Sequence, residues 1–322
     1  MAMRAVFAMV MASVMVDAAV AQVPSFPSEA ELVYVRFHVE RKGGGYVSDV
    51  GREQLRVLED GKPRTIAVLE TAGTRDRTVL PEVTLVLDVS SSVMDDRLLD
   101  ETLIRQVLLG SLHAQSNVSL CAFGGRLECF TEPTRDAAAL MDAFKRALRF
   151  GHETRRHGTR LYASVAEIAR RAAASGGRAQ RAMILFTDAL DTEGGRVKDA
   201  VEAVTAADVR VYAVKVSQAF QDTAPSRGPF SRGTPNRAMY DYRKLELDAL
   251  PEATGGRSYE PGTLDEESLA GILREIGAEI SNEVVVGYAP EGAPTGRQRK
   301  VKVELIDKAL GKIRDGERTL VR

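Results

Sequence analysis

Tryptophan is absent from the sequence, cysteine occurs twice, and the formal net charge of the 322 residues is −1 at pH 7. Because binding to a phosphate backbone needs a basic surface, this charge balance argues against nucleic-acid binding by the chain as a whole. The sequence also lacks a Gly-x-Ser-x-Gly nucleophile elbow and a Gly-Lys-Ser/Thr phosphate loop. These two absences argue against the enzyme classes that depend on those motifs.

Long hydrophobic runs are missing beyond the amino terminus. Met1–Arg4 is a short basic start, Ala5–Val16 is an apolar run, and Ala19-Val20-Ala21 gives a small-x-small pattern before Gln22. This layout is typical of a signal peptide, and the run is too short for a membrane-spanning helix. The alternative is an amphipathic or disordered start of a cytosolic protein. We expect a signal peptide at 1–21 and an exported chain, periplasmic or extracellular, with no transmembrane segment after cleavage.

The two cysteines, Cys121 and Cys129, flank a short glycine-containing stretch. If the stretch is a hairpin with a three-residue loop at Gly124–Arg126, the cysteines lie opposite each other, at disulfide distance. A two-residue loop would shift the register and separate them. An exported protein permits the disulfide; the alternative is two small buried thiols.

The segment Pro81–Asp96 organises the chain. An apolar run ends at Asp88, and Ser90 and Ser92 follow at intervals of two residues. An uninterrupted apolar run is typical of a strand buried on both faces in a parallel sheet, and ligands bind at the carboxyl ends of such strands. One carboxylate and two hydroxyls are hard oxygen donors that suit a cation such as Mg²⁺. The alternative is structural, because Ser92 and Asp95 also match a capping box.

Two later points add donors to this set. The apolar run 182–186 ends at Thr187-Asp188, and His157-Gly158-Thr159 precedes an alanine-rich helix. The Asp188 carboxylate is expected at the sheet edge where Asp88 lies, and the Thr159 hydroxyl is expected at the start of a helix. The candidate metal ligands are Asp88, Ser90, Ser92, Thr159 and Asp188.

Strands and helices alternate through the middle of the chain, whereas both ends contain only short strands. In the middle, strands are expected at 118–123, 127–130, 182–186 and 209–216, and helices at 97–112, 136–150, 161–174, 197–207, 245–254 and 264–281. At the ends, strands are expected at 32–39, 54–59, 65–69, 284–288, 300–307 and 319–321, with an Asp60-Gly61 hairpin turn after the second.

We therefore expect the two ends to combine into one small sheet or sandwich, in which the α/β unit is an insertion. The predicted divisions after the signal peptide are 22–78 (β strands, first part), 79–282 (α/β domain) and 283–322 (β strands, second part).

These motifs resemble the von Willebrand factor type A (VWA) domain and its metal-ion-dependent adhesion site (MIDAS). The family's Asp-x-Ser-x-Ser is similar to Asp88–Ser92, its Gly-Thr-x-Leu-Tyr to Gly158–Tyr162, and its Thr-Asp to Thr187-Asp188. The flanking Asp60-Gly61-Lys62-Pro63 and Tyr288-Ala289-Pro290 resemble the exported bacterial proteins related to this family. Two positions depart from the pattern: Ala189 replaces a usual Gly, and Ala163 replaces a frequent Asp.

The resemblance implies a doubly wound, mostly parallel sheet flanked by helices. It implies that the serines and Thr159 coordinate a divalent cation, most often Mg²⁺ with Mn²⁺ or Ca²⁺ as alternatives, and that both aspartates act directly or through water. The ion would keep a position for a carboxylate from a protein partner, so the expected activity is adhesion or protein binding, not catalysis. The alternatives are a metal-assisted hydrolase that uses His157 as its base, and a scaffold with a vestigial metal site.

A run of basic residues surrounds Thr159. Between Lys145 and Arg181 there are ten Lys or Arg residues and two Glu. Arg155, Arg156 and Arg160 are expected to steer an acidic partner toward the metal, although a solvated helix face would read the same way. The loop Gln218–Tyr242 is expected on the metal face, where it would shape the choice of partner; the alternative is a disordered insertion.

The exported protein is predicted to begin near Gln22, because signal peptides are cleaved after a small-x-small pattern. Intact-mass measurement of the exported product tests the prediction. An exported protein that still carries Met1 would contradict it.

Overall fold

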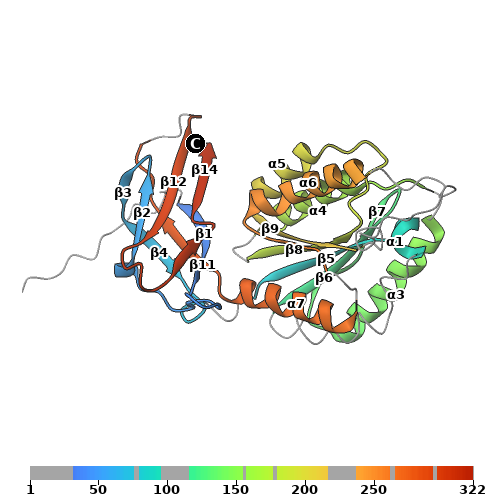
Figure 1. Cartoon of the computed structure of the whole chain (residues 1–322), viewed down its shortest axis with the longest axis horizontal. Coiled ribbons are helices and arrows are strands. Elements are labelled where there is room, and N and C mark those ends of the chain that lie inside the picture. Colours follow the sequence, from blue (N-terminus) through green and yellow to red (C-terminus); the bar gives the residue numbers. More distant parts are fainter. Residues whose placement is uncertain are drawn as a thin grey trace, which may run out of the picture.

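The structure is a computed structural model that describes residues 32–75, 80–95, 116–154, 157–176, 180–216, 237–261, 265–292 and 296–321. It contains an antiparallel β unit and an α/β unit (Figure 1). The predictions for the signal peptide, the helix at 97–112, Arg155 and Arg156 lie outside the described residues. None of the helices in the described ranges has the length and apolar character needed to cross a membrane.

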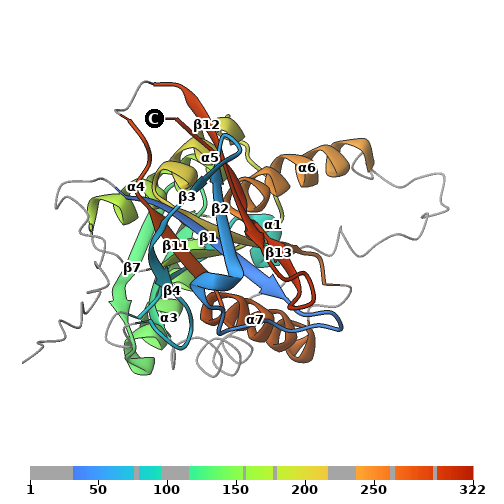
Figure 2. The same cartoon turned by 90° about the vertical axis from the view of Figure 1, so that its left-hand side faces the viewer.

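Strands from both ends of the chain form the β unit. Its two four-stranded sheets have the orders β13-β1-β11-β4 and β14-β12-β2-β3 (Figures 1 and 2). The strands are β1 (Val33–Glu40), β2 (Leu55–Glu59), β3 (Lys62–Arg64), β4 (Ile66–Glu70), β11 (Val284–Tyr288), β12 (Gln298–Leu305), β13 (Lys312–Arg314) and β14 (Glu317–Val321). A short 3₁₀ helix, η1 (Arg52–Gln54), precedes β2. Apolar residues of both sheets form one buried cluster, so the unit is a β-sandwich that needs both chain ends, as expected.

The Asp60-Gly61 turn forms as predicted, but its second strand was predicted wrongly. Glu59 pairs with Lys62, and both turn residues have positive φ, 50° and 78°, as the favoured two-residue hairpin turn requires. The strand after the turn is β3, which contains Pro63. The predicted strand at 65–69 corresponds to β4, which belongs to the other sheet.

The α/β unit has a six-stranded sheet in the order β10-β9-β8-β5-β6-β7, in which only the β6–β7 pairing is antiparallel. Its strands are β5 (Glu82–Asp88), β6 (Asn117–Phe123), β7 (Leu127–Thr134), β8 (Arg181–Thr187), β9 (Val209–Lys215) and β10 (Ser258–Tyr259). Its helices are α1 (Ser91–Asp95), α3 (Ala137–Thr154), α4 (Leu161–Ala174), α5 (Val197–Ala206), α6 (Arg237–Thr254) and α7 (Glu266–Ser281).

Helices cover both faces of this sheet. Helices α3 and α7 lie on one face, and α4, α5 and α6 lie on the other (Figure 1). Residues of β5 alternate between the two apolar clusters: Leu85 and Leu87 face α3 and α7, whereas Val86 faces α4. The uninterrupted apolar run that predicted a central strand therefore reflects burial on both faces, and the predicted fold class is confirmed.

Some predicted boundaries were wrong. Helix α3 continues to Thr154 rather than Phe150, and α6 begins at Arg237, so 237–242 is helical and not loop. The three prolines that predicted a loop all precede Arg237. The predicted Cys hairpin is confirmed: Phe123 pairs with Leu127, Cys121 pairs with Cys129, and the two sulfurs form a disulfide of 2.05 Å.

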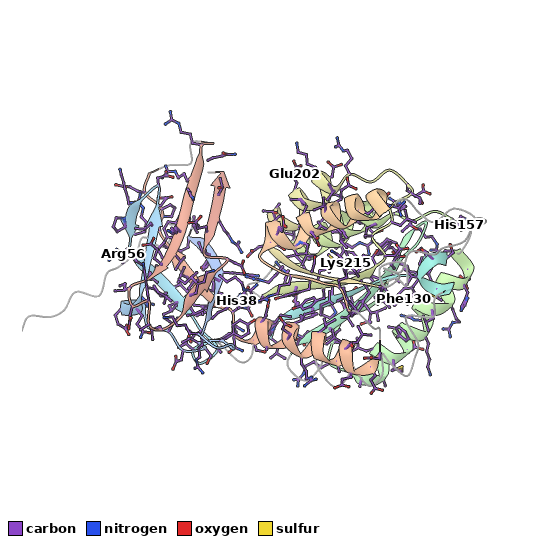
Figure 3. The ribbon with its side chains drawn as sticks, viewed as in Figure 1. His38, Arg56, Phe130, His157, Glu202 and Lys215 are labelled. Carbon is purple, nitrogen blue, oxygen red and sulfur yellow. A yellow bond between two sulfur atoms is a disulfide. The ribbon has the colours of Figure 1, made fainter. Side chains whose placement is uncertain are left out.

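A layer of charged side chains joins the sandwich to the α/β unit. Alternate residues of β1 face away from the sandwich core (Figure 3 shows His38 between the units). Arg210 Nη2 lies 2.7 Å from Glu283 Oε1, and Arg36 Nε lies 3.1 Å from Asp208 Oδ2. Burial alone would raise the pKa of Glu283, but Arg210 and Arg36 outweigh it and lower that pKa below its ordinary value.

Replacing Glu283 by Gln is predicted to lower the free energy of unfolding by about 3 kcal/mol, because it leaves the buried Arg210 guanidinium with only the ion pair to Asp315. Urea denaturation at neutral pH measures the change. The control is Lys198→Gln, which breaks an exposed pair with Glu202 on α5 and is expected to cost less than about 1 kcal/mol. Equal stability of the two variants would contradict the assignment of the charged layer as a structural joint.

Candidate metal site

Asp88 ends β5 and is completely buried. Its Oδ1 accepts a hydrogen bond from the backbone N–H of Ser90 at 2.9 Å, and its Oδ2 accepts one from the hydroxyl of Thr187 at 2.7 Å. The carboxylate is therefore fixed both by its own turn and by the end of the neighbouring strand β8.

The two serines connect this turn to the loop after β8. The hydroxyl oxygens of Ser90 and Ser92 are 3.3 Å apart, and the Ser92 hydroxyl donates to Asp188 Oδ2 at 2.6 Å. Helix α1 already begins at Ser91, so Ser92 lies in its first turn. The alternative of Ser92 as a helix cap is therefore wrong, because a cap residue precedes the first helical residue.

The loop after β8 has an unusual backbone at Ala189. Its φ is +62°, in the left-handed region, where a residue with a Cβ costs roughly 1–2 kcal/mol. This conformation accounts for the usual Gly at the position. Asp188 stabilises the turn, because its Oδ1 accepts the N–H of Leu190 at 3.0 Å.

Thr159 is buried and bound to this second loop through its backbone. Its N–H donates to the hydroxyl of Thr192 at 2.7 Å, and its carbonyl accepts the Thr192 N–H at 2.9 Å. Asp191 reinforces the connection, since its Oδ2 accepts the N–H of Tyr162 at 3.1 Å and its Oδ1 that of Gly195 at 3.1 Å.

Asp191 and Thr192 were missed by sequence reasoning, as was the bond from Thr187 to Asp88. The available signal was the polar stretch Asp191–Gly195 after Asp188. Asp and Thr in such a stretch commonly bond to nearby backbone N–H groups.

The β6–β7 hairpin lies beside the candidate site and contacts it through its backbone. The Phe123 carbonyl accepts the N–H of Val89, and the Gly124 carbonyl accepts the N–H of Arg160, both at 2.9 Å. Gly125 is required here, because a Cβ at that position would lie 2.3 Å from the Cβ of His157. The hairpin thus contacts both the Asp88 turn and the Thr159 loop.

Four of the five predicted residues are joined by hydrogen bonds, directly or through Thr187: Asp88, Ser90, Ser92 and Asp188. Thr159 is connected to the loop of Asp188 through Thr192. The site lies at the end of the α/β unit remote from the sandwich, where Figure 1 shows α1 and Figure 3 shows His157.

The electrostatics of this edge favour a cation. Burial, and then the negative charge of Asp188, raise the pKa of Asp88 to about 7. Among the described residues no three His, Cys, Asp or Glu side chains cluster as metal ligands, so the donors here are two carboxylates with hydroxyls. An all-oxygen set suits a hard divalent cation, and its charge would offset the repulsion between the two carboxylates. The residues present therefore fit a metal ion.

Comparison with known proteins places the central domain. The family model described as von Willebrand factor type A domain matches residues 82–226. No curated protein matches the chain.

Several solved structures are similar to the chain. BatB from Bacteroides thetaiotaomicron has 19% identity and a TM-score of 0.42, over 62% of this chain and 98% of BatB. A von Willebrand factor type A protein from Catenulispora acidiphila has 13% identity and a TM-score of 0.44, over 91% of this chain and 74% of that one. Proximal thread matrix protein 1 from the mussel byssus, with a zinc-occupied MIDAS motif, has 12% identity and a TM-score of 0.45, over 65% of this chain and 47% of that one.

With its doubly wound sheet, its Asp-x-Ser-x-Ser turn at the carboxyl end of β5 and the match at 82–226, the chain carries a von Willebrand factor type A domain.

Proposed function

We propose that the chain is an exported bacterial protein that binds an acidic protein partner through a divalent cation at its MIDAS. The observation that carries the proposal is the hydrogen bond between the Ser92 hydroxyl and Asp188, together with the bonds of Asp88. These contacts gather oxygen donors from two strand ends at one point of the sheet edge.

The five residues would hold the ion in different ways. Ser90, Ser92 and Thr159 would supply hydroxyl oxygens, and Asp88 and Asp188 would bind directly or through water. Mg²⁺ is the first choice, with Mn²⁺ or Ca²⁺ as alternatives. When bound, the ion supplies a position for an outside carboxylate, and it attracts that group strongly because hydroxyl ligands do not neutralise its charge.

Protein binding is favoured over metal-assisted hydrolysis. A hydrolase needs a base within reach of the substrate, and His157 was the candidate from the sequence. Its Nδ1 lies 3.3 Å from the carbonyl oxygen of Thr154, and its side chain is exposed. This contact turns one ring nitrogen toward the backbone of α3.

Two features support export. The first is the signal-peptide pattern at 1–21. The second is the disulfide between Cys121 and Cys129, because disulfides persist mainly in oxidising compartments such as the periplasm or the extracellular space.

Metal binding is predicted to weaken as the pH falls through about 7, because the ion must then displace the proton of Asp88. Calorimetric titration with Mg²⁺ at pH 6 and pH 8 should show roughly tenfold weaker binding at pH 6. Without metal, the sign for stability is the reverse. The folded protein keeps a proton that the unfolded chain releases, so this group lowers stability as the pH rises from about 4 to 7.

Replacing Asp88 by Asn should remove this pH dependence along with most of the Mg²⁺ affinity. Glu202→Gln, on the exposed part of α5, is the control. Equal Mg²⁺ affinity of the wild-type protein at pH 6 and pH 8 would contradict the assignment of Asp88.

Partner binding is predicted to need both the metal and its ligands. Affinity capture from the native envelope in Mg²⁺, followed by elution with chelator, should release proteins that Asp88→Ala does not retain. Ser92→Ala removes the hydroxyl that donates to Asp188, and it should lower the yield with only a small change in the melting temperature, because the residue is exposed. Proteins retained equally by all three forms, or retained in chelator, would count against metal-mediated binding.

A further inference from the structure

A pocket of about 310 Å³ lies between α4 and the start of α5. Arg160, which follows Thr159 in the chain, forms one part of its wall, and Gly195 and Arg196, from the loop after β8, form another. The pocket therefore adjoins two of the three loops that would hold the ion.

Hydrogen bonds hold the two walls of the pocket together at the end nearest the candidate metal site. The carboxylate of Asp191 accepts the N–H of Tyr162 on one wall and the N–H of Gly195 on the other, each at 3.1 Å. The Arg160 backbone is anchored as well, since its N–H donates to the Gly124 carbonyl. The walls of the pocket are thus held in place by backbone hydrogen bonds.

Most of the negative charge that lines the pocket is already paired. Asp199 accepts two hydrogen bonds from Arg196, at 2.7 and 2.9 Å, and Glu167 accepts one from Arg171 at 2.6 Å. Arg160 and Arg170 also line the pocket, and within the described ranges neither forms an ion pair. Two guanidinium groups are therefore available to an anion.

Basic residues are fewer farther along the groove. A second hollow of about 420 Å³ continues between α4 and α5 and shares Arg170 and Asp199 with the first. Its other lining residues are alanines and Glu202. The first pocket therefore offers a carboxylate two guanidinium groups, Arg160 and Arg170, whereas the second offers only Arg170.

We propose that this pocket receives a second carboxylate of the partner, beside the one that binds the ion. The inference rests on the proposed function and specifies the partner: a protein segment with two acidic side chains close together. Arg160 and Arg170 donate hydrogen bonds to the second carboxylate. Charge-assisted hydrogen bonds of this kind are among the stronger polar contacts at protein surfaces.

Synthetic peptides test this directly. The probes are seven-residue peptides with one central Glu in a Gly/Ser background, and a matched set with a second Glu placed one to four positions away. Fluorescence anisotropy in Mg²⁺ should show that at least one two-Glu peptide binds the wild-type protein about tenfold more tightly than the one-Glu peptide. The double variant Arg160→Gln/Arg170→Gln should reduce this ratio to about one.

The control is Arg274→Gln on α7, which is exposed, lies on the opposite face of the sheet from the pocket, and should keep the tenfold ratio. Mg²⁺-dependent binding of one-Glu and two-Glu peptides with equal affinity would overturn this inference and leave the proposed function standing. A tenfold difference between two-Glu and one-Glu peptides that persists in the double variant would likewise overturn this inference and leave the proposed function standing. Failure of all peptides to bind in a Mg²⁺-dependent way would overturn both.

Discussion

The arrangement of the candidate metal site depends on the buried carboxylate of Asp88. An ionised group without water needs several hydrogen-bond donors, and Asp88 takes one from its own turn and one from Thr187 at the end of β8. Because these donors belong to adjacent parallel strands, meeting this requirement aligns the two strand ends. Ser92 then lies where its hydroxyl reaches Asp188, and the Ser90 hydroxyl lies 3.3 Å from that of Ser92. The arrangement is costly without a cation, since two carboxylates share a region of low dielectric.

Asp191 and Thr192 position the walls of the site rather than its centre. Asp191 binds backbone N–H groups of both the α4 and α5 sides, and Thr192 exchanges hydrogen bonds with Thr159. These contacts keep the Thr159 loop beside the loop of Asp188. The pocket with Arg160 and Arg170 follows from the same contacts, because its two walls are the segments that Asp191 joins.

Much of the fold could be predicted because the signals are local. The buried strands β5 and β8 appear in the sequence as uninterrupted apolar runs, and parallel strands bring their carboxyl ends to one edge. Thr159 was harder to place, since only a family pattern connected it to Asp88. The role of Asp191 in joining the two loops could not be assigned in advance, because its partner on the far side is the N–H of Tyr162, 29 residues earlier in the chain. The charged layer at Arg210 and Glu283 also escaped prediction, since it pairs residues from distant parts of the chain.

The sandwich is continuous with both ends of the α/β unit. Strand β4 leads into that unit and β11 leads out of it, and the two strands are antiparallel neighbours, with Glu70 opposite Val285. A mechanical pull on the end of the α/β unit that carries the candidate metal site, directed away from the sandwich, would therefore load β4 and β11 together and in the same direction. The tension would not slide one strand past the other, and their mutual hydrogen bonds would be spared. The α/β unit is thus joined to the sandwich by two parallel attachments, which would share a load applied to the far end of that unit.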